Sequence, residues 1–306
     1  MYRVKDIKKI LDENVQGQEK AKRAAAVLVY NKMRGIKENI VFVGPSGCGK
    51  TEIFRALKEK FKNLIFIYDV SNITNDGFSG IKKSYSVFES MIISGFSKEE
   101  IENSIIVLDE FDKMCQSKHT AQGDNVSSSI QAEFLTMIEG TVVKAKVLDD
   151  YVYFNTSNIS FVFCGAFEDI YKKKKMSAQK SFGFSNETNK TDETITTEDL
   201  IDYGVRTEIM GRISRIVELY YLSEEDIKNL LMDPHKSPIS KLAIDYKCEI
   251  DIKEDTIDML IKSGLDNSRG VRALRGIIQD YIDMEIYEPG SSKSLTIRYQ
   301  ESEQSR

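Results

Sequence analysis

The sequence is poor in the residues that build metal centres and disulfide frameworks. Only two histidines are present, His119 and His235, and neither has a partner at metal-ligand spacing. The 306 residues include four widely separated cysteines, namely Cys48, Cys115, Cys164 and Cys248. They show none of the paired spacings that hold zinc, and no secretory signal precedes them. We therefore expect reduced, intracellular thiols and no zinc site.

Long apolar runs and a strong excess of one charge are also missing. No run approaches the ~20 apolar residues that cross a bilayer. The 43 basic and 48 acidic residues leave a formal net charge of -5, which offers no attraction to nucleic acid or an anionic membrane. The 41% of hydrophobic residues excludes disorder over most of the chain and suits roughly two packed domains. We expect a soluble, cytoplasmic protein with no membrane partner, and a nucleic-acid partner becomes a minority hypothesis.

Helical and strand patterns alternate over the first part of the chain. Helical spacing of apolar residues predicts helices at 18–34, 50–61, 87–95 and 130–139. Short apolar runs predict strands at 40–43, 64–70, 105–108, 151–154 and 159–163. Strands that alternate with helices pair in parallel, so we predict an α/β fold with a parallel sheet of about five strands. The polar stretch 172–198, with one apolar island, predicts a long exposed loop.

The composition changes near residue 222, where helical patterns become dominant. Ser223 and Asp226 form a capping-box-like start for a helix that ends near Met232. Further helices are predicted at 238–245, 254–262 and 268–287, and short strands at 249–252 and 294–298. We predict a large α/β domain over 1–219, a hinge at 220–222, a smaller, mainly helical α+β domain over 223–299 and a polar tail at 300–306.

A glycine-rich loop lies directly between the strand predicted at 40–43 and the helix predicted at 50–61. Its residues fit G-x-x-x-x-G-K-S/T and are Gly44, Pro45, Ser46, Gly47, Cys48, Gly49, Lys50 and Thr51. In that context backbone N–H groups and the helix N-terminus bind phosphate, Lys50 reaches the β and γ phosphates, and Thr51 offers its hydroxyl to Mg²⁺. The flanking strand and helix disfavour the alternative, a glycine-rich turn with a stray lysine. We predict a nucleoside triphosphate site.

Two carboxylates end the strand predicted at 105–108, as expected for the acidic partner of a phosphate loop. Asp109 is the candidate for the Mg²⁺ shell. Glu110, directed at the γ-phosphate, is the candidate general base that polarises the attacking water. An apolar run that ends in Asp-Glu is commonplace by itself, so this interpretation depends on the upstream phosphate loop.

Seven short boxes follow one another in the order and nearly the spacing of a known family. They are VQGQEKAK at 15–22, GPSGCGKT at 44–51, LDEFDK at 108–113, MIEGT at 137–141, CGAF at 164–167, MGR at 210–212 and GVRALR at 270–275. Together they resemble the ClpX family, the AAA+ unfoldases of the Clp protease, over almost the whole chain. The resemblance implies an AAA+ P-loop large domain, a small C-terminal domain, and ATP with Mg²⁺ as cofactors. The N-terminal zinc-binding domain of that family is expected to be absent, because the AAA+ module begins within a few residues of Met1.

The resemblance also assigns roles around the nucleotide. Val15 matches a residue that supports the nucleotide pocket, and Gln16 stands beside the adenine, where it replaces the aliphatic residue that is usual in the family. Arg212 matches the arginine that a neighbouring subunit inserts toward the γ-phosphate, and Arg272 matches the sensor arginine that reaches the nucleotide of its own subunit. A finger that acts in trans implies a ring, because a heterologous contact that closes gives cyclic symmetry. The family forms hexamers, so we expect a homo-hexamer.

Two further segments match regions of ClpX that contact polypeptides. The first pore loop of the family corresponds to Gly77, Phe78, Ser79 and Gly80. An aromatic between glycines suits nonspecific traction on a polypeptide, although a buried phenylalanine that caps a turn is the alternative. Phe182, Gly183 and Phe184 stand where ClpX carries the tripeptide that docks on its partner peptidase ClpP. Docking on ClpP and a tuck of this loop onto its own domain both stay open.

The leading functional hypothesis is an ATP-dependent protein unfoldase or remodelling chaperone. It would hydrolyse ATP in a ring and thread protein substrates through a central pore, feeding a ClpP-type peptidase if the docking hypothesis holds. A nucleotide-dependent scaffold or switch without threading is one alternative. A nucleic-acid-associated loader is another, which the acidic balance and the lack of a basic arm disfavour.

Overall fold

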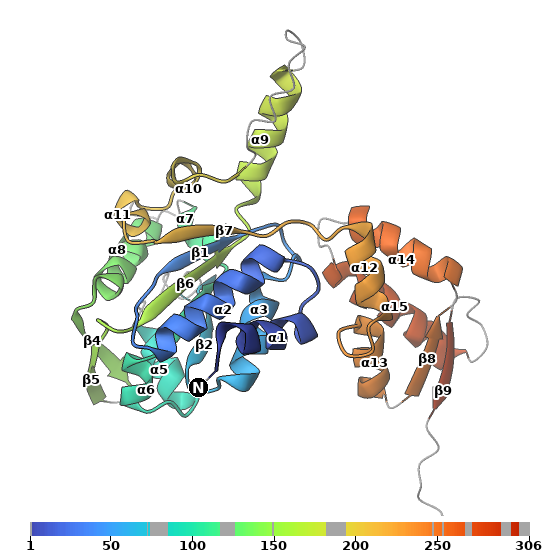
Figure 1. Cartoon of the computed structure of the whole chain (residues 1–306), viewed down its shortest axis with the longest axis horizontal. Helices are drawn as coiled ribbons and strands as arrows, with labels where there is room; N and C mark the ends of the chain where they lie inside the picture. The colour runs from blue at the N-terminus through green and yellow to red at the C-terminus, as the bar shows by residue number, and fades with distance from the viewer. Residues whose placement is uncertain are drawn as a thin grey trace, which may run out of the picture. The chain divides into compact units, whose positions relative to one another are not determined.

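The computed structural model describes residues 2–71, 73, 85–116, 126–148, 150–181, 194–246, 248–252, 254–266, 271–288 and 295–299. They form two compact units, shown in Figure 1. The larger unit comprises Met1–Leu11, Glu19–Pro45 and Lys50–Leu219. The smaller unit comprises Asp12–Gln18, Ser46–Gly49 and Tyr220–Arg306.

A five-stranded parallel sheet forms the centre of the larger unit (Figure 1). Its strands, in spatial order, are β2 (Ile65–Asp69), β3 (Ile105–Asp109), β6 (Ser160–Gly165), β1 (Ile40–Val43) and β7 (Arg215–Glu218). Every residue of β1 and of β6 is buried, as expected for parallel strands that are covered on both faces. The register pairs Val43 with Gly165, so the carboxyl ends of the central strands meet at one edge.

Helices cover both faces of this sheet. On one face, α2 (Glu19–Met33) and α3 (Lys50–Lys60) pack, and the ring of Phe42 meets that of Phe54 edge to face at 5.0 Å. On the other face, β-strand residues share a large apolar core with α5 (Ser86–Ile93), α8 (Val126–Glu139), α10 (Thr197–Tyr203) and α11 (Thr207–Met210). The other described helices of this part of the chain are α1 (Val4–Asn14), α6 (Lys98–Glu102), α7 (Asp112–Cys115) and α9 (Glu168–Ser181).

The predicted number of strands in the sheet is confirmed, but one member of the prediction is wrong. The segment predicted at 151–154 belongs to β5 (Asp150–Asn155), which pairs with β4 (Val142–Val147) in a separate antiparallel hairpin. In β4 exposed and buried residues alternate, so the hairpin has one face on the core and one in solvent. The fifth strand of the main sheet is instead β7, a short run with charged residues at both ends.

The expectation of a continuous loop over 172–198 is also wrong in part. The helix α9 continues through Lys172 to Ser181 and extends away from the rest of the larger unit in Figure 1. Acidic residues in its first turn complement the helix dipole, and the lysines that follow are good helix formers. Lys174 forms an ion pair with Asp199 of α10 at 2.7 Å. The chain is described again from residue 194.

The smaller unit is mainly helical. Its elements are α12 (Glu224–Met232), α13 (Pro238–Tyr246), β8 (Cys248–Ile252), α14 (Glu254–Asp266), α15 (Val271–Tyr287) and β9 (Leu295–Tyr299). The strands β8 and β9 pair antiparallel, and leucines and isoleucines of the helices form a separate core. The predicted capping box is confirmed, because the hydroxyl of Ser223 accepts from the N–H of Asp226 at 3.1 Å and the Asp226 carboxylate accepts from the N–H of Ser223.

Candidate functional site

The candidate site lies at the carboxyl edge of the sheet. The glycine-rich loop leaves β1 after Val43 and enters α3 at Lys50, and β3 ends at Asp109. Within the loop Gly47 and Gly49 have φ of 76° and 101°, backbone conformations that favour glycine over any other residue. The sequence therefore forms the turn that a phosphate-binding loop requires, directly between the predicted strand and helix.

Thr51 and Asp109 meet at this edge. The Thr51 hydroxyl donates a hydrogen bond to Oδ2 of Asp109 at 2.7 Å, and the Thr51 side chain is buried at the start of α3. A hydroxyl and a carboxylate placed side by side are hard oxygen ligands, the type that Mg²⁺ takes in nucleotide sites. The two residues predicted from sequence to hold the metal are thus brought together, and they fit it chemically.

Lys50 is turned back onto its own loop. Its ammonium group donates to the carbonyl oxygens of Gly44 and of Pro45, the latter at 2.8 Å, and only 9% of the residue is exposed. Both acceptors are neutral carbonyl groups of the loop itself, and the charge of Lys50 also opposes the rise that burial causes in the pKa of Asp112. Because phosphate oxygens are charged acceptors and make stronger hydrogen bonds than carbonyl groups, an anionic ligand would compete well for this ammonium.

Glu110 is presented on a strained turn immediately after β3. Its φ is 58°, which is uncommon for a residue with a side chain, and its N–H donates to Oδ1 of Asp109 at 3.1 Å. The carboxylate forms an ion pair with Lys113, and this hydrogen bond raises the pKa of Lys113. Both side chains reach solvent, so the pair contributes only about 0–1 kcal/mol. The Glu110 carboxylate can therefore leave Lys113 at small cost.

Asp112 ties the ends of β3 and β6 together. Burial raises the pKa of its carboxyl group, and a hydrogen bond from the N–H of Ala166 opposes that shift. A Cβ atom on Gly165 would lie 3.0 Å from Oδ1 of Asp112 and 2.4 Å from the ring of Phe167. A side chain at position 165 would therefore displace the ring of Phe167 and crowd the Asp112 carboxylate behind the candidate site.

A hydrogen-bonded cluster in the smaller unit includes one residue that the sequence did not single out. Gln18 donates through Nε2 to the carbonyl oxygens of Cys48 at 3.1 Å and of Tyr220 at 2.6 Å, and its Oε1 accepts from the N–H of Tyr220 at 3.2 Å. It thus joins the glycine-rich loop to the first residue of the predicted hinge. Val15 is buried, with its Cγ1 3.9 Å from a Cβ built on Gly49, and Gln16 is partly exposed. The only sequence signal for Gln18 was its place in the VQGQEKAK box.

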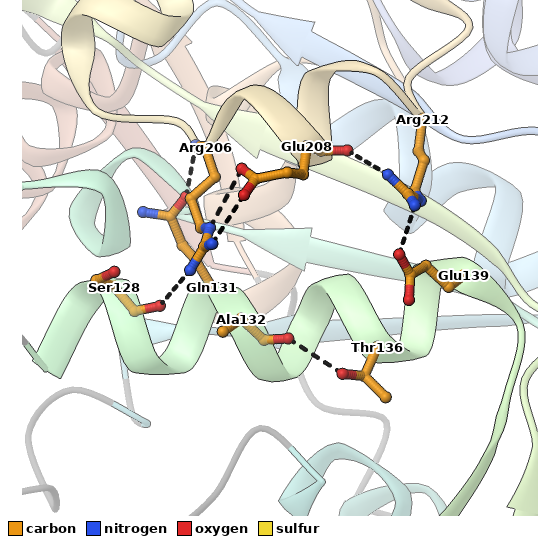
Figure 2. Close-up of polar contacts among 8 residues, drawn as sticks. All are labelled: Ser128, Gln131, Ala132, Thr136, Glu139, Arg206, Glu208 and Arg212. Atoms are coloured by element: carbon orange, nitrogen blue, oxygen red, sulfur yellow. Dashed lines mark hydrogen bonds and ion pairs between the residues drawn. The ribbon is translucent and has the colours of Figure 1, made fainter.

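Arg212 lies at the end of α11, above the last turn of α8 (Figure 2). Its Nη1 donates to the carbonyl oxygen of Glu208 at 2.9 Å, and its Nη2 forms an ion pair with the carboxylate of Glu139. The first residue before α11, Arg206, pairs instead with the Glu208 carboxylate at 2.9 Å. The sequence indicated a role for Arg212, but its only signal for Glu139 was the place of that residue in the MIEGT box.

The other predicted site residues are placed only in part. Arg272 falls in α15, and its side chain lies outside the described residues. Two further predicted segments lie outside the described residues. They are the pore-loop segment of Gly77, Phe78, Ser79 and Gly80, and the docking segment of Phe182, Gly183 and Phe184.

The described residues contain neither a disulfide nor a cluster of metal ligands. All four cysteines lie in the described part of the chain, where they are buried and form no disulfide. Among the described ranges no cluster of three or more histidine, cysteine or acidic side chains could hold a metal ion. No helix in the part of the chain that the structure describes is long and apolar enough to span a bilayer.

Comparisons with known proteins agree with this geometry. The model of the ATPase family associated with various cellular activities (AAA) matches residues 40–193, which is half of the chain and includes the glycine-rich loop and the Asp-Glu pair. The model of the C-terminal D2-small domain of ClpB protein matches residues 222–298. The ATP-dependent Clp protease ATP-binding subunit ClpX of Treponema denticola is 28% identical over 321 residues, covering 94% of this chain and 77% of that protein.

Proposed function

This chain belongs to the AAA family of ATPases, and from that premise we propose that it is an ATP-driven protein unfoldase of the ClpX type. It binds nucleotide and hydrolyses ATP, and it is similar to ClpX over both of its units. The proposal adds Mg²⁺ as the metal, a homo-hexameric ring, protein substrates and threading through a central pore. The observation that best supports the catalytic part is the contact of Thr51 with Asp109 directly beside Glu110.

In the proposed hydrolysis each residue of the candidate site has one task. Lys50 binds the β and γ phosphates, exchanging its two loop carbonyl acceptors for phosphate oxygens. Thr51 and Asp109 hold Mg²⁺, which when bound supplies positive charge against the phosphate oxygens. Glu110 leaves Lys113, orients the attacking water and accepts its proton.

The ring part of the proposal depends on two arginines. Arg212 would act on the γ-phosphate bound by the neighbouring subunit, and arginine fingers of this type change kcat by about 10³–10⁵. Its side chain is 38% exposed, so it is accessible to a neighbour. Arg272 would contact the nucleotide of its own subunit and link it to closure about the hinge at 220–222. Within the smaller unit, the contacts of Gln18 with Cys48 and Tyr220 join the glycine-rich loop to the first residue of that hinge.

Substrate traction is assigned to Phe78 between Gly77 and Gly80, on the strength of the family resemblance. The test is the ATPase rate of the purified protein with and without casein, alongside Phe78→Ala. We expect casein to stimulate the wild type and not the variant. An ATPase rate that casein does not change, and that is the same in the variant, would refute threading. That result would favour a nucleotide-dependent scaffold or switch.

The variant Glu110→Gln tests the proposed role of Glu110 as general base. It should bind ATP and assemble but hydrolyse almost none, because the amide cannot accept the proton of the attacking water. Substantial turnover in this variant would remove Glu110 from the role of base, whatever the result with casein.

Docking on a ClpP-type peptidase is a separate part of the proposal. Retention of the chain on immobilised ClpP should be lost in Phe184→Ala. Equal retention of the wild type and the variant would count against docking through residues 182–184.

A further inference from the structure

The guanidinium group of Arg212 is held at two points within its own subunit (Figure 2). Nη1 donates to the main-chain oxygen of Glu208, one turn earlier, and Nη2 pairs with the carboxylate of Glu139. Glu139 is the last residue of α8 and lies 73 residues away in sequence. Because the guanidinium group is planar, two fixed nitrogen atoms define both its position and its plane.

This arrangement leaves the arginine able to bind a further acceptor. A guanidinium group carries five N–H donors, and the two contacts occupy one on Nη1 and one on Nη2. The side chains of Arg212 and Glu139 are 38% and 39% exposed, so solvent reaches the pair. An ion pair this exposed contributes little to folding, and its main consequence is the direction that it gives to the arginine.

The helix that carries Glu139 is itself fixed to the segment that carries Arg212. Gln131 of α8 is 2% exposed, donates to the carbonyl oxygen of Gly204 at 3.0 Å and accepts from the N–H of Arg206 at 3.0 Å. Figure 2 shows Gln131 and Glu139 along the same helix, facing the two ends of α11. The helix α8 therefore holds α11 at its start through Gln131 and at its end through Glu139.

We propose that Glu139 is a positioning residue for Arg212, which fixes the guanidinium in the orientation in which it serves the neighbouring subunit. The inference rests on the proposed trans role of Arg212 and adds a second residue to it. Glu139 does not touch the nucleotide in this scheme; its carboxylate restrains the group that does. Removal of the Glu139 carboxylate should lower kcat for ATP hydrolysis. It should leave the KM for ATP unchanged, because the ATP on which Arg212 acts is bound by residues of the neighbouring subunit.

A mixed-ring experiment separates this role from a general structural one. Rings are formed from Glu110→Gln subunits, which keep the finger but cannot hydrolyse, and Arg212→Ala subunits, which keep Glu110 but lack the finger. Hydrolysis then occurs only where an Arg212→Ala subunit has a Glu110→Gln neighbour. Glu139→Gln is introduced either into the finger donor or into the finger acceptor.

We expect the recovered ATPase to fall about tenfold when Glu139→Gln is in the donor, because the Arg212 guanidinium is then misdirected. We expect no change when Glu139→Gln is in the acceptor. Glu139→Asp in the donor should retain part of the activity. Glu133→Gln in the donor, which removes the same charge from the same helix, should have no effect. Equal losses in donor and acceptor, or no loss in the donor, would overturn the inference.

The same experiment tests the proposed function separately. If the two parent variants recover no ATPase when mixed, although each assembles, Arg212 does not act in trans, and the ring mechanism and the inference are both refuted. If they recover ATPase that is insensitive to Glu139, only the inference is refuted.

Discussion

Gly204 gives the sharpest test of how α11 is placed. It ends α10 with φ of 121° and ψ of 11°, and a Cβ atom there would lie 2.2 Å from the carbonyl oxygen of Cys115. Both atoms of that contact are fixed, since one is on the main chain of α7 and the other would be bonded to the main chain of residue 204. Gly204→Ala must therefore shift one backbone segment by about 1 Å, at a cost typical of overpacking.

The magnitude follows from comparison with a matched glycine. Gly35 also has a positive φ, 76°, but a Cβ atom there would meet no atom within 4 Å. Gly35→Ala should cost about 1–2 kcal/mol for the left-handed backbone conformation alone. Gly204→Ala should cost that plus about 1–3 kcal/mol for the collision. The difference between the two variants therefore contains the contact with Cys115 together with the greater backbone strain of an alanine at φ 121°.

The assay is urea unfolding followed by far-ultraviolet circular dichroism, because the chain has no tryptophan to report by fluorescence. Gly204→Ala should also slow ATP hydrolysis, since Gln131 binds both Gly204 and Arg206 and a shift there moves α11. Equal losses of stability in the two variants, with the ATPase unaffected in both, would refute the reasoning.

Three more predictions follow from buried contacts. Thr51→Ala should raise the Mg²⁺ concentration needed for half-maximal ATPase, because Asp109 loses the neighbouring ligand; an unchanged Mg²⁺ titration would contradict the assignment. Gln18→Leu should lower the ATPase rate several-fold more than it lowers nucleotide affinity, because it releases the glycine-rich loop from Tyr220; equal effects on rate and affinity would contradict this role. Burial, with a smaller effect of Lys37, lowers the pKa of Lys32 to about 8 from 10.5. Between these values the unfolded chain binds more protons than the folded chain, so stability should rise with pH across that window, and Lys32→Met should flatten the rise in urea unfolding.

Local sequence patterns were sufficient to predict much of the fold. The runs of buried apolar residues predicted four of the five sheet strands, and the Ser223 capping box placed the start of α12. These features depend on side chains within a few residues of one another, so the sequence alone contains the information. The position of the glycine-rich loop between a strand and a helix was predictable for the same reason.

The fifth strand was not predictable from local pattern. The segment 151–154 and β7 are both short, and the structure places only β7 beside β1. A strand joins the main sheet only if an unpaired backbone edge of that sheet lies beside it. The strand β5 pairs instead with β4, from which only two residues of the sequence separate it. The helix α9 was missed because its lysine-rich sequence lacks an apolar stripe, although lysine itself favours helix.

By itself the sequence indicated the chemistry available to this protein: a phosphate loop, a threonine and an aspartate as candidate metal ligands, a glutamate as candidate base, and two arginines to which the family resemblance gives roles. The tertiary structure alone decided which partners those groups meet. Asp109 meets Thr51 from 58 residues away, Gln18 meets Tyr220 from 202 residues away, and Arg212 meets Glu139 from 73 residues away. Such pairs arise because the sheet and its helices bring distant segments together, which no local periodicity records.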